Sequence, residues 1–491
     1  MCGAQLCSND NVGRPAHQRI RHNGRTQYDK SYLWGDNLRL LQTLDTINRR
    51  SVRYDYDTFG SLSGAVYGDG SRQWRNPDAM GNVYDSPDRT DRSYGRGGQL
   101  REDKKWRYYY DSHGNLVLKT MRRMEPLRNA EARDEFLAWQ NGDYAYTWQG
   151  NGMLRSVTRP DGKTLTFKYD ALGRRIEKVF DGRVYRYLWD GDVILHEWDY
   201  TEADRPNTIV TETGEVTLDR SEPVENLITW VYDSDSYVPT AKIVGDRHYS
   251  IISDYIGRPV QAYDDNGNIV WQADYDIYGN IRNLHGSRKF IPFRQLGQYE
   301  DEETRLYYNR FRYYDPRIGT YISQDPIRLA GGNPTLYAFV CDTNIQKDQL
   351  GLTVEGRSTN VVISTGADAN ATMPGYSPPY KPNAKVTEFT TMRDEVFVRV
   401  HGAENKCGPW MMHEAAIRGL SPEQIKAKFN LPDTPTHVST VTVPAGTRMR
   451  SGKVNPLPEF GGVDMNAKQF QLLERIPNEN FGNTKKIKSY H

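Results

Sequence analysis

The chain has 491 residues, enough for several domains of about 150 residues each, and its formal net charge is +1. A charge this close to zero excludes a global basic field for nucleic acid and a global acidic field for a basic ligand. The four cysteines are too few for a disulfide framework, and Cys2 and Cys7 lack the His or second Cys pair of a zinc site, so the sequence predicts no metal.

The first residues, MCGAQLCSNDNVGRPAHQ, contain no apolar core of a signal peptide. Nowhere does the chain approach the ~18 consecutive apolar residues of a membrane helix. We therefore expect a protein that is made in the cytoplasm, has no membrane span and, if it is exported, leaves without a conventional signal peptide.

Residues 1–290 are predicted to form one region, and from about residue 30 this region repeats a loose unit: an aromatic strand ending in Tyr-Asp, a Gly turn, then Arg or Asn and an apolar residue. Examples are YDYDTFGSLSGAVY from Tyr54, YYYDSHGNLVLKTM from Tyr108, FKYDALGRRIEKVF from Phe167, AYDDNGNIVWQADY from Ala262 and DYDIYGNIRNL from Asp274. The 33 Tyr against 14 Phe suit strands whose rings pack while their hydroxyls stay wet or bonded. The pattern predicts stacked antiparallel hairpins in a mainly β shell, with an ordinary β-sandwich as the alternative.

Two segments interrupt the repeats. Residues 121–143, MRRMEPLRNAEARDEFLAWQNGD, predict a short helix. Residues 203–226, ADRPNTIVTETGEVTLDRSEPVEN, predict a polar loop or a small extra hairpin.

Residues 291–352 contain, in order, LYYNRFRYYDP, YISQDPI, LAGG and LYAF. These motifs resemble the end of the core of Rhs/YD-repeat proteins. The resemblance implies that the segment closes a β-cage around a variable C-terminal toxin and that the chain cuts itself just after a DPxGL motif. That motif corresponds to DQLGL at 348–352, with Gln349 in place of the proline; upstream, Asp342-Thr343 stands where the family usually has Asn-Pro.

The family's closed cages use a longer shell, and this sequence begins inside repeat-like material. We therefore expect a partial cage, from a truncated or alternatively started Rhs protein.

The self-cleavage implied by the resemblance is that of an aspartic protease acting on its own chain. Of two carboxylates placed close together, one keeps a proton and acts as acid while the other activates water. By resemblance the pair is Asp325 and Asp348, Arg312 tunes them, and the cut follows Leu352. The alternative is that both aspartates only form turns.

After Leu352 the composition changes. Residues 353–385 are rich in Ser, Thr, Pro, Gly and Asn and predict a mobile linker. Residues 386–491 predict a compact α+β domain. Its clearest helix starts at Ser421 as N-cap, with Pro422 at the first position and Gln424 completing a capping box.

The order of elements in 386–491 resembles toxins of the ADP-ribosyltransferase fold, a superfamily that also contains NAD glycohydrolases. Arg399 in VFVRVHG would match the first-strand arginine that grips the dinucleotide. Gln469 in KQFQLLERIP would match the catalytic Gln of the last motif. His401, Trp410 and Ser439 are the further candidates for contacts with NAD+.

Two departures from that pattern bear on the reaction. The glycines usually found directly before the Gln are replaced by VDMNAK, and Gln471 stands where transferases commonly carry Glu. Gln471 and Glu474 complete the catalytic candidates, so both ADP-ribosyl transfer and NAD+ hydrolysis stay open. The alternatives without a role in catalysis are that Arg399 faces solvent and that His401 and Trp410 are packing residues.

Three functions are consistent with these features. The first is an Rhs effector with an NAD+-consuming toxin, using NAD+ as substrate and no metal. The second is a nuclease toxin in the same position, although 386–491 show no HNH-like His cluster or paired acidic metal site. The third is a non-enzymatic YD-repeat remnant.

The first function implies several partners. A cognate immunity protein would protect the producer, and a secretion-system spike or adaptor would export the protein into the cytoplasm of a target bacterium. The acceptor of ADP-ribose, protein or nucleic acid, is not identified by the sequence.

Overall fold

The structure is a computed structural model that describes residues 5–10, 14–35, 39–58, 60–123, 130–233, 236–331, 333, 335–352, 355–356, 362–373, 377–391, 394–403, 405–444, 447–463 and 467–487. The chain divides into two compact units. Unit 1 is Met1–Cys7 and His17–Glu355, and unit 2 is Ser8–Ala16 and Gly356–His491.

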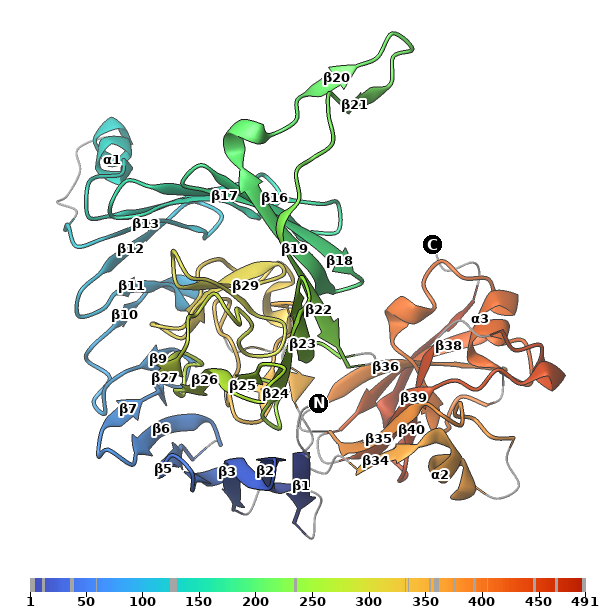
Figure 1. Ribbon diagram of the computed structural model, residues 1–491. Helices are drawn as coiled ribbons and strands as arrows, with labels where there is room; N and C mark the ends of the chain where they lie inside the picture. Colours follow the sequence, from blue (N-terminus) through green and yellow to red (C-terminus); the bar gives the residue numbers. More distant parts are fainter. Residues whose placement is uncertain are drawn as a thin grey trace. The chain divides into compact units, whose positions relative to one another are not determined.

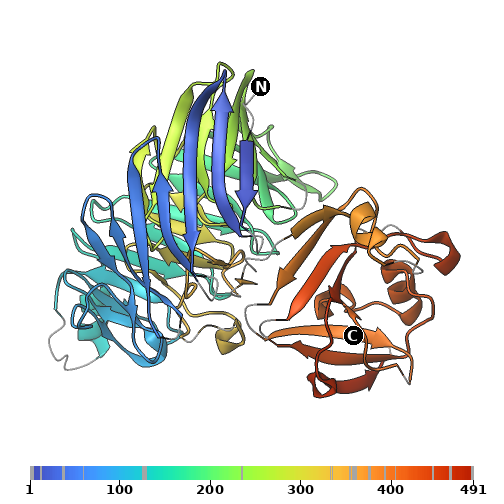
Figure 2. The same cartoon turned by 90° about the horizontal axis from the view of Figure 1, so that it is seen from below.

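The shell region, up to residue 285, consists of antiparallel strands that pair in chain order (Figure 1). The N-terminal sheet contains β1 Gln5–Asn9, β2 Pro15–His22, β3 Arg25–Trp34, β4 Leu40–Asp45, β5 Arg50–Tyr56, β6 Leu62–Tyr67 and β7 Arg72–Trp74, and Figure 2 shows its strands side by side in blue. A small pair follows, β8 Asn76–Pro77 and β9 Val83–Tyr84.

The largest sheet runs without a crossover in the order β10 to β19 and then β22 to β27. Its strands are β10 Ser93–Tyr94, β11 Leu100–Glu102, β12 Arg107–Tyr110, β13 Leu116–Thr120, β14 Tyr144–Trp148, β15 Leu154–Thr158, β16 Thr164–Tyr169, β17 Arg175–Phe180, β18 Arg183–Asp190, β19 Val193–Thr201, β22 Glu225–Tyr232, β23 Pro239–Val244, β24 Arg247–Ser253, β25 Pro259–Tyr263, β26 Ile269–Tyr275 and β27 Ile281–His285. The prediction of a mainly β region of successive antiparallel hairpins is therefore confirmed.

The Asp and Gly of each repeat build the same turn. In the turn after β12, Asp111 Oδ1 accepts from the N–H groups of His113 and Asn115, and Gly114 adopts a φ of 80°. Glycine adopts this left-handed conformation without a steric penalty. The same arrangement recurs at Asp170 and Gly173, Asp254 and Gly257, Asp264 and Gly267, and Asp276 and Gly279.

In three repeats the Tyr joins one hairpin to the previous one. Its hydroxyl donates to the carbonyl of the residue two positions after the glycine of the neighbouring turn, as in Tyr110 to Leu100 (3.0 Å), Tyr169 to Leu154 (2.8 Å) and Tyr275 to Pro259 (2.7 Å). The Tyr-Asp pair therefore fixes both the turn and the stacking of successive repeats.

The closing segment forms a buried four-stranded sheet, whose strand β29 lies inside the curve of the shell strands (Figure 1). Its strands are β28 Tyr299–Asp301, β29 Leu306–Asn309, β30 Arg312–Asp315 and β31 Thr320–Tyr321. Tyrosines of the segment reach the turns of the shell. Tyr307, Tyr308 and Tyr337 donate to the carbonyls of Gly279, Gly173 and Gly114.

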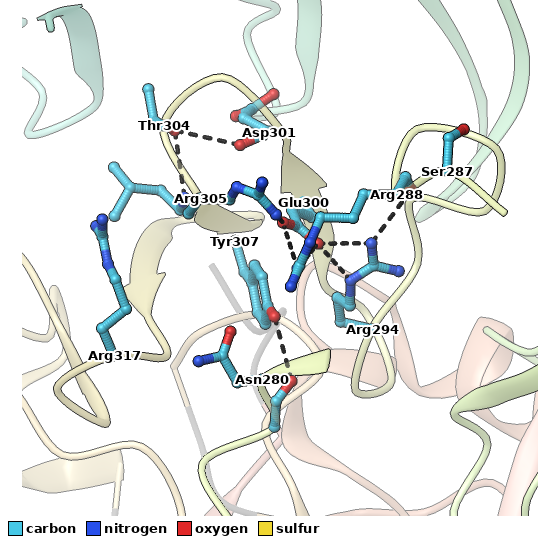
Figure 3. A network of polar contacts seen from close by, with 12 residues as sticks. Asn280, Ser287, Arg288, Arg294, Glu300, Asp301, Thr304, Arg305, Tyr307 and Arg317 are labelled. Atoms are coloured by element: carbon cyan, nitrogen blue, oxygen red, sulfur yellow. Dashed lines mark hydrogen bonds and ion pairs between the residues drawn. The ribbon is translucent and has the colours of Figure 1, made fainter. Parts of the chain in front are cut away.

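Buried ion pairs anchor the same segment. Asp301 lies 2.6 Å from Arg175 and 3.4 Å from Lys178, both on β17. The neighbouring Glu300 contacts three arginines, Arg288, Arg294 and Arg305 (Figure 3). Because an unpaired buried charge costs several kcal/mol, these contacts specify where the segment sits in the shell.

Both interruptions of the repeats form secondary structure. A helix, α1 Ala130–Leu137, lies within the segment predicted to be helical. The second interruption contains the hairpin of β20 Thr208–Val210 and β21 Val216–Leu218, which agrees with the hairpin alternative.

Unit 2 combines two antiparallel sheets with short helices. One sheet has the order β34-β35-β39-β40-β37 and the other β36-β38-β41. The elements are β34 Val362–Thr365, α2 Gly366–Ala371, β35 Lys385–Thr390, β36 Glu395–His401, β37 Trp410–Met411, α3 Pro422–Phe429, β38 His437–Val443, β39 Arg448–Lys453, β40 Lys468–Leu472 and β41 Phe481–Lys486. The capping box of α3 at Ser421 and Gln424 is present as predicted.

Short elements complete the chain. The strands β32 Gln346–Lys347 and β33 Glu355–Gly356 pair with each other. The single-turn helices are η2 Arg96–Gly98, η3 Glu202–Asp204, η4 Arg328–Gly331, η5 Glu414–Ala416, η6 Pro458–Phe460 and η7 Asn478–Asn480. No helix within the described ranges is long and apolar enough to cross a membrane.

The expected linker at 353–385 needs a correction. In its described part, β34 pairs with β35 from Thr365↔Lys385 to Val362↔Glu388, and α2 follows directly. The helix is fixed by a capping box in which Thr365 Oγ1 accepts from Asp368 N–H. Residues 362–371 are therefore part of unit 2.

Candidate functional sites

The three residues implied in self-cleavage lie together in the closing segment of unit 1. Arg312 is in β30, Asp325 follows β31 and Asp348 follows β32, and each is at most 2% exposed. Arg312 Nη2 lies 2.9 Å from Asp325 Oδ2 and 3.2 Å from Asp348 Oδ2. One guanidinium nitrogen therefore bridges the two carboxyl groups.

The two carboxyl groups have different surroundings. Burial raises the pKa of Asp325, and the charge of Arg312 opposes this rise. Asp348 accepts from the Tyr321 hydroxyl at 2.9 Å, the Leu352 N–H at 2.8 Å and Arg312. Since donors stabilise the ionised form of a carboxyl group, the surroundings of Asp348 favour its ionised form, whereas burial favours the protonated form of Asp325.

The loop that carries the predicted cut is held mainly by its backbone. Arg312 Nε donates to the carbonyl of Gly351, and Phe311 N–H donates to that of Leu350 at 3.3 Å. Gly351 has a φ of 67°, and a Cβ there would lie 2.5 Å from the Asn309 carbonyl oxygen. The Gly of the motif is therefore required by both conformation and space. Thr353, on the far side of the predicted cut, lies outside the described residues.

The two departures from the family motif are both accommodated. Thr343 Oγ1 donates to the Ile277 carbonyl at 3.0 Å. The backbone carbonyl of Gln349 packs closely on Gly297. A Cβ at position 297 would lie 2.2 Å from that carbonyl oxygen. The loop is thus ordered without the motif proline.

Sequence reasoning missed two polar residues of this site, Asn309 and Tyr321. Asn309 Nδ2 donates to Tyr321 Oη at 2.7 Å and to the Asp348 carbonyl at 2.8 Å. Both stand inside the quoted motifs LYYNRF and YISQDPI. Their burial, 0% and 1% exposed, was the missing information, because a sequence does not show which Tyr of many faces the aspartates.

In unit 2, four of the candidate residues line one cavity of about 610 Å³. They are Arg399 and His401 from β36, Trp410 from β37 and Gln469 from β40. A concave site of this size with a few polar groups on apolar walls is typical of small-molecule sites.

Arg399 is the charged group of this cavity. It is 8% exposed, and its Nη1 donates to the Trp410 carbonyl at 3.0 Å. The guanidinium packs on Gly408, where a Cβ would lie 2.5 Å from Nη2. Burial lowers the pKa of Arg399, and its Nε has no partner among the described groups. A guanidinium that lines a cavity suits an anionic ligand.

His401 is held as a neutral ring. Its Nδ1 lies 2.6 Å from the Gly402 carbonyl, which only accepts, so Nδ1 carries the hydrogen and Nε2 accepts from Ser439 Oγ at 2.8 Å. Burial is the main cause that lowers the pKa of His401. Ser439 is fully buried and bonds Thr484 behind the ring, so it supports His401 and does not line the cavity.

The catalytic candidates of β40 are placed differently. Gln469 Nε2 donates to the Pro379 carbonyl at 2.8 Å, beside the cavity. Gln471 bonds the Tyr380 hydroxyl at 3.2 Å and Met373 Sδ, away from the cavity-lining set. Glu474 accepts from Arg448 N–H at 2.7 Å and lines a second cavity of about 510 Å³. Among the described residues, no group of three or more His, Cys, Asp or Glu is arranged for a metal ion.

Comparisons with known proteins identify relatives of this chain. The family model for the Teneurin YD-shell matches residues 7–330. Double-stranded DNA deaminase toxin A of Burkholderia cenocepacia (strain H111) is 32% identical over 346 residues, covering 65% of this chain and 21% of that protein. Toxin protein Tse5 of Pseudomonas aeruginosa is 31% identical over 393 residues, covering 70% and 28%.

The chain thus spans between 21% and 28% of the length of these two relatives. Among solved structures, the crystal structure of TcdB2-TccC3 is 16% identical with a TM-score of 0.39, covering 71% of this chain and 21% of that one. The family match over residues 7–330, on a fold of successive Tyr-Asp hairpins, shows that the chain belongs to the YD-shell family.

Proposed function

We propose that this chain is part of an Rhs-type polymorphic toxin: a YD shell whose closing segment cuts the chain after Leu352 and releases a C-terminal NAD+-consuming domain. Family membership and the names of the relatives, which are toxins, support the toxin reading. The matched family model ends at residue 330, so the activity of unit 2 is argued from its own residues.

The observation that carries self-cleavage is the position of Arg312, which contacts both aspartates and the carbonyl of Gly351. In the reaction, Asp348 takes a proton from a water molecule whose oxygen attacks the carbonyl carbon of Leu352. As the bond to the nitrogen of Thr353 breaks, Asp325 gives its proton to that nitrogen. The products are a Leu352 carboxyl group and a Thr353 amine.

For unit 2, the shared cavity of Arg399, His401, Trp410 and Gln469 supports NAD+ as substrate. Arg399 would bind the diphosphate, Trp410 would stack on a ring, and Gln469 would bond ribose hydroxyls as nicotinamide leaves. Gln471 and Glu474, the residues that transfer to an acceptor would need, lie outside the lining set. Hydrolysis of NAD+ is therefore the better-supported form, and ADP-ribosyl transfer is the second.

The test is NAD+ turnover by the purified full chain, with nicotinamide and ADP-ribose quantified. Gln469→Ala should lower turnover by about a hundredfold or more, as loss of a transition-state contact does. Gln424→Ala, which removes only a partner of the α3 capping box, is the matched control. Stable NAD+ in the parent, together with degraded DNA or tRNA, would replace this proposal with the nuclease alternative.

The cellular setting follows from the same proposal. A cognate immunity protein would bind unit 2 in the producer, and a secretion-system spike or adaptor would carry the protein out without a conventional signal peptide. The toxin domain would act in the cytoplasm of the target cell.

A further inference from the structure

Asp348 is held by two polar side chains that the self-cleavage motif does not include. Asn309 Nδ2 donates to Tyr321 Oη and also to the backbone carbonyl of Asp348. Tyr321 Oη lies 2.9 Å from Asp348 Oδ2. The same pair therefore fixes both the side chain and the backbone of Asp348.

We propose that Asn309 and Tyr321 are positioning residues of self-cleavage: they hold Asp348 as the charged base and thereby leave Asp325 as the proton donor. This inference rests on the proposed self-cleavage. It adds the residues that decide which carboxyl group is the acid and which the base. Arg312 alone does not decide this, since one of its nitrogens contacts both carboxyl groups.

The direction of each hydrogen bond follows from donor chemistry. A carbonyl oxygen only accepts, so the Asn309 atom that faces the Asp348 carbonyl is the amide nitrogen. The same nitrogen donates to Tyr321 Oη, so the single hydroxyl hydrogen is directed at Asp348 Oδ2. A donor aimed at a carboxylate stabilises its charged form.

Among the described residues, no side-chain hydroxyl donates to Asp325. Its contacts are the backbone N–H of Ile327 at 2.9 Å and the shared Arg312. The charged and titratable groups that face the pair are Arg312 from β30, Tyr321 from β31 and the other aspartate. The hydroxyl of Tyr321 is thus a source of the difference between the two carboxyl groups.

Two further buried polar atoms belong to residues of this site. Arg312 Nη1 and Asn309 Oδ1 are buried and have no hydrogen-bond partner among the described groups. One is a donor and the other an acceptor, the two kinds of group that orient a water molecule for attack.

The ring of Tyr321 has a separate task, which allows a clean substitution. The Arg312 guanidinium lies 3.7 Å from the ring centroid, in cation–π contact. Tyr321→Phe keeps this contact and removes only the hydroxyl. Tyr307→Phe is the matched control, because Tyr307 is equally buried in the same sheet but donates to the Gly279 carbonyl of a shell turn (Figure 3).

The experiment follows self-cleavage of the freshly synthesised full chain by intact mass, over time and from pH 4 to 9. Tyr321→Phe should cut about tenfold or more slowly than the parent, as expected for a lost bond to a charged group. Asp348 becomes harder to ionise, so the limb on which activity falls with falling pH should move to higher pH. Asn309→Asp, which replaces the donor by an acceptor of equal size, should slow the cut as well.

The outcomes separate the two proposals. If Tyr321→Phe cuts at the parent's rate with the parent's pH profile, while Asp348→Asn stays intact, the positioning role is wrong and self-cleavage stands. Equal slowing in Tyr307→Phe would show a general packing effect and would also overturn the role. A parent chain that stays intact at every pH overturns self-cleavage and this inference together.

Discussion

The two candidate sites of this chain differ in burial and in the kind of substrate that each could take. The aspartate pair of unit 1 is at most 2% exposed, and its proposed substrate is a loop of the same chain that bonds Arg312 and Phe311. The cavity of unit 2 has a volume of about 610 Å³ and is lined by Arg399, whose Nε has no hydrogen-bond partner among the described groups. An intramolecular reaction needs no entry path, whereas a reaction on a free molecule needs a preformed cavity with spare hydrogen-bonding groups.

The largest expected effect is on the rate of self-cleavage by the aspartate pair of unit 1. Asp348→Asn and Asp325→Asn each remove one member of the acid–base pair, so each should slow self-cleavage by about a thousandfold or more. Intact mass should show one full-length species in place of two fragments.

The control for this change is Asp265→Asn, an exposed carboxylate of the shell whose side chain is 59% exposed. It should cut as the parent does. If Asp348→Asn cut at the parent's rate, the aspartate pair would not be the self-cleavage site, and the comparison with the cavity of unit 2 would fail.

The second prediction tests the cavity of unit 2. Arg399→Lys keeps the charge but loses the planar fork, so NAD+ turnover should fall about ten- to a hundredfold through a higher KM. Self-cleavage should be unchanged in the same samples. Arg418→Lys, at an exposed position of the same unit, is the matched control. A change in self-cleavage upon Arg399→Lys would show that the two sites are not independent.

The sequence predicted the repeated elements better than their connections. The Asp and Gly of each turn were visible because their hydrogen bonds span only four residues. The carbonyls that Tyr110 and Tyr169 bond lie in the preceding turn, and no local pattern identifies them. The linker at 353–385 was wrong in its described part because composition was weighed above the Thr365–Asp368 capping box.

The sites show the same division. Arg312, Asp325 and Asp348 were identified through resemblance to a family, and the structure brings them together. Asn309 and Tyr321 were missed, since their role depends on a contact across 27 to 39 residues. In unit 2, alternation along β40 places Gln469 and Gln471 on one face, yet only Gln469 lines the cavity.

A third prediction concerns Asp342, which stands where the family usually has Asn. Asp342 is 2% exposed, and burial raises its pKa to about 6. The folded state therefore binds this proton more tightly than the unfolded chain does, so stability falls as pH rises from about 4 to about 6. Asp342→Asn keeps the oxygen that accepts from Asn344 N–H and removes the charge.

The variant should therefore be more stable than the parent at pH 7 by roughly 1–3 kcal/mol, the size of a shift of about two pKa units. At pH 4 the two should unfold alike. Urea unfolding at both pH values measures the difference. Equal stability at pH 7 would mean that Asp342 is ionised at no cost in the shell.

The smallest effect separates the stacking of repeats from the chemistry. Tyr110→Phe removes one hydroxyl that donates to the Leu100 carbonyl of the neighbouring turn, so the shell should lose about 1 kcal/mol in urea unfolding. Self-cleavage and NAD+ turnover should both be unchanged, because the contact lies in neither site. Asp348→Asn should show the reverse pattern, a lost cut in a shell that still folds. If Tyr110→Phe instead slowed self-cleavage, the aspartate pair of unit 1 would depend on the packing of distant repeats.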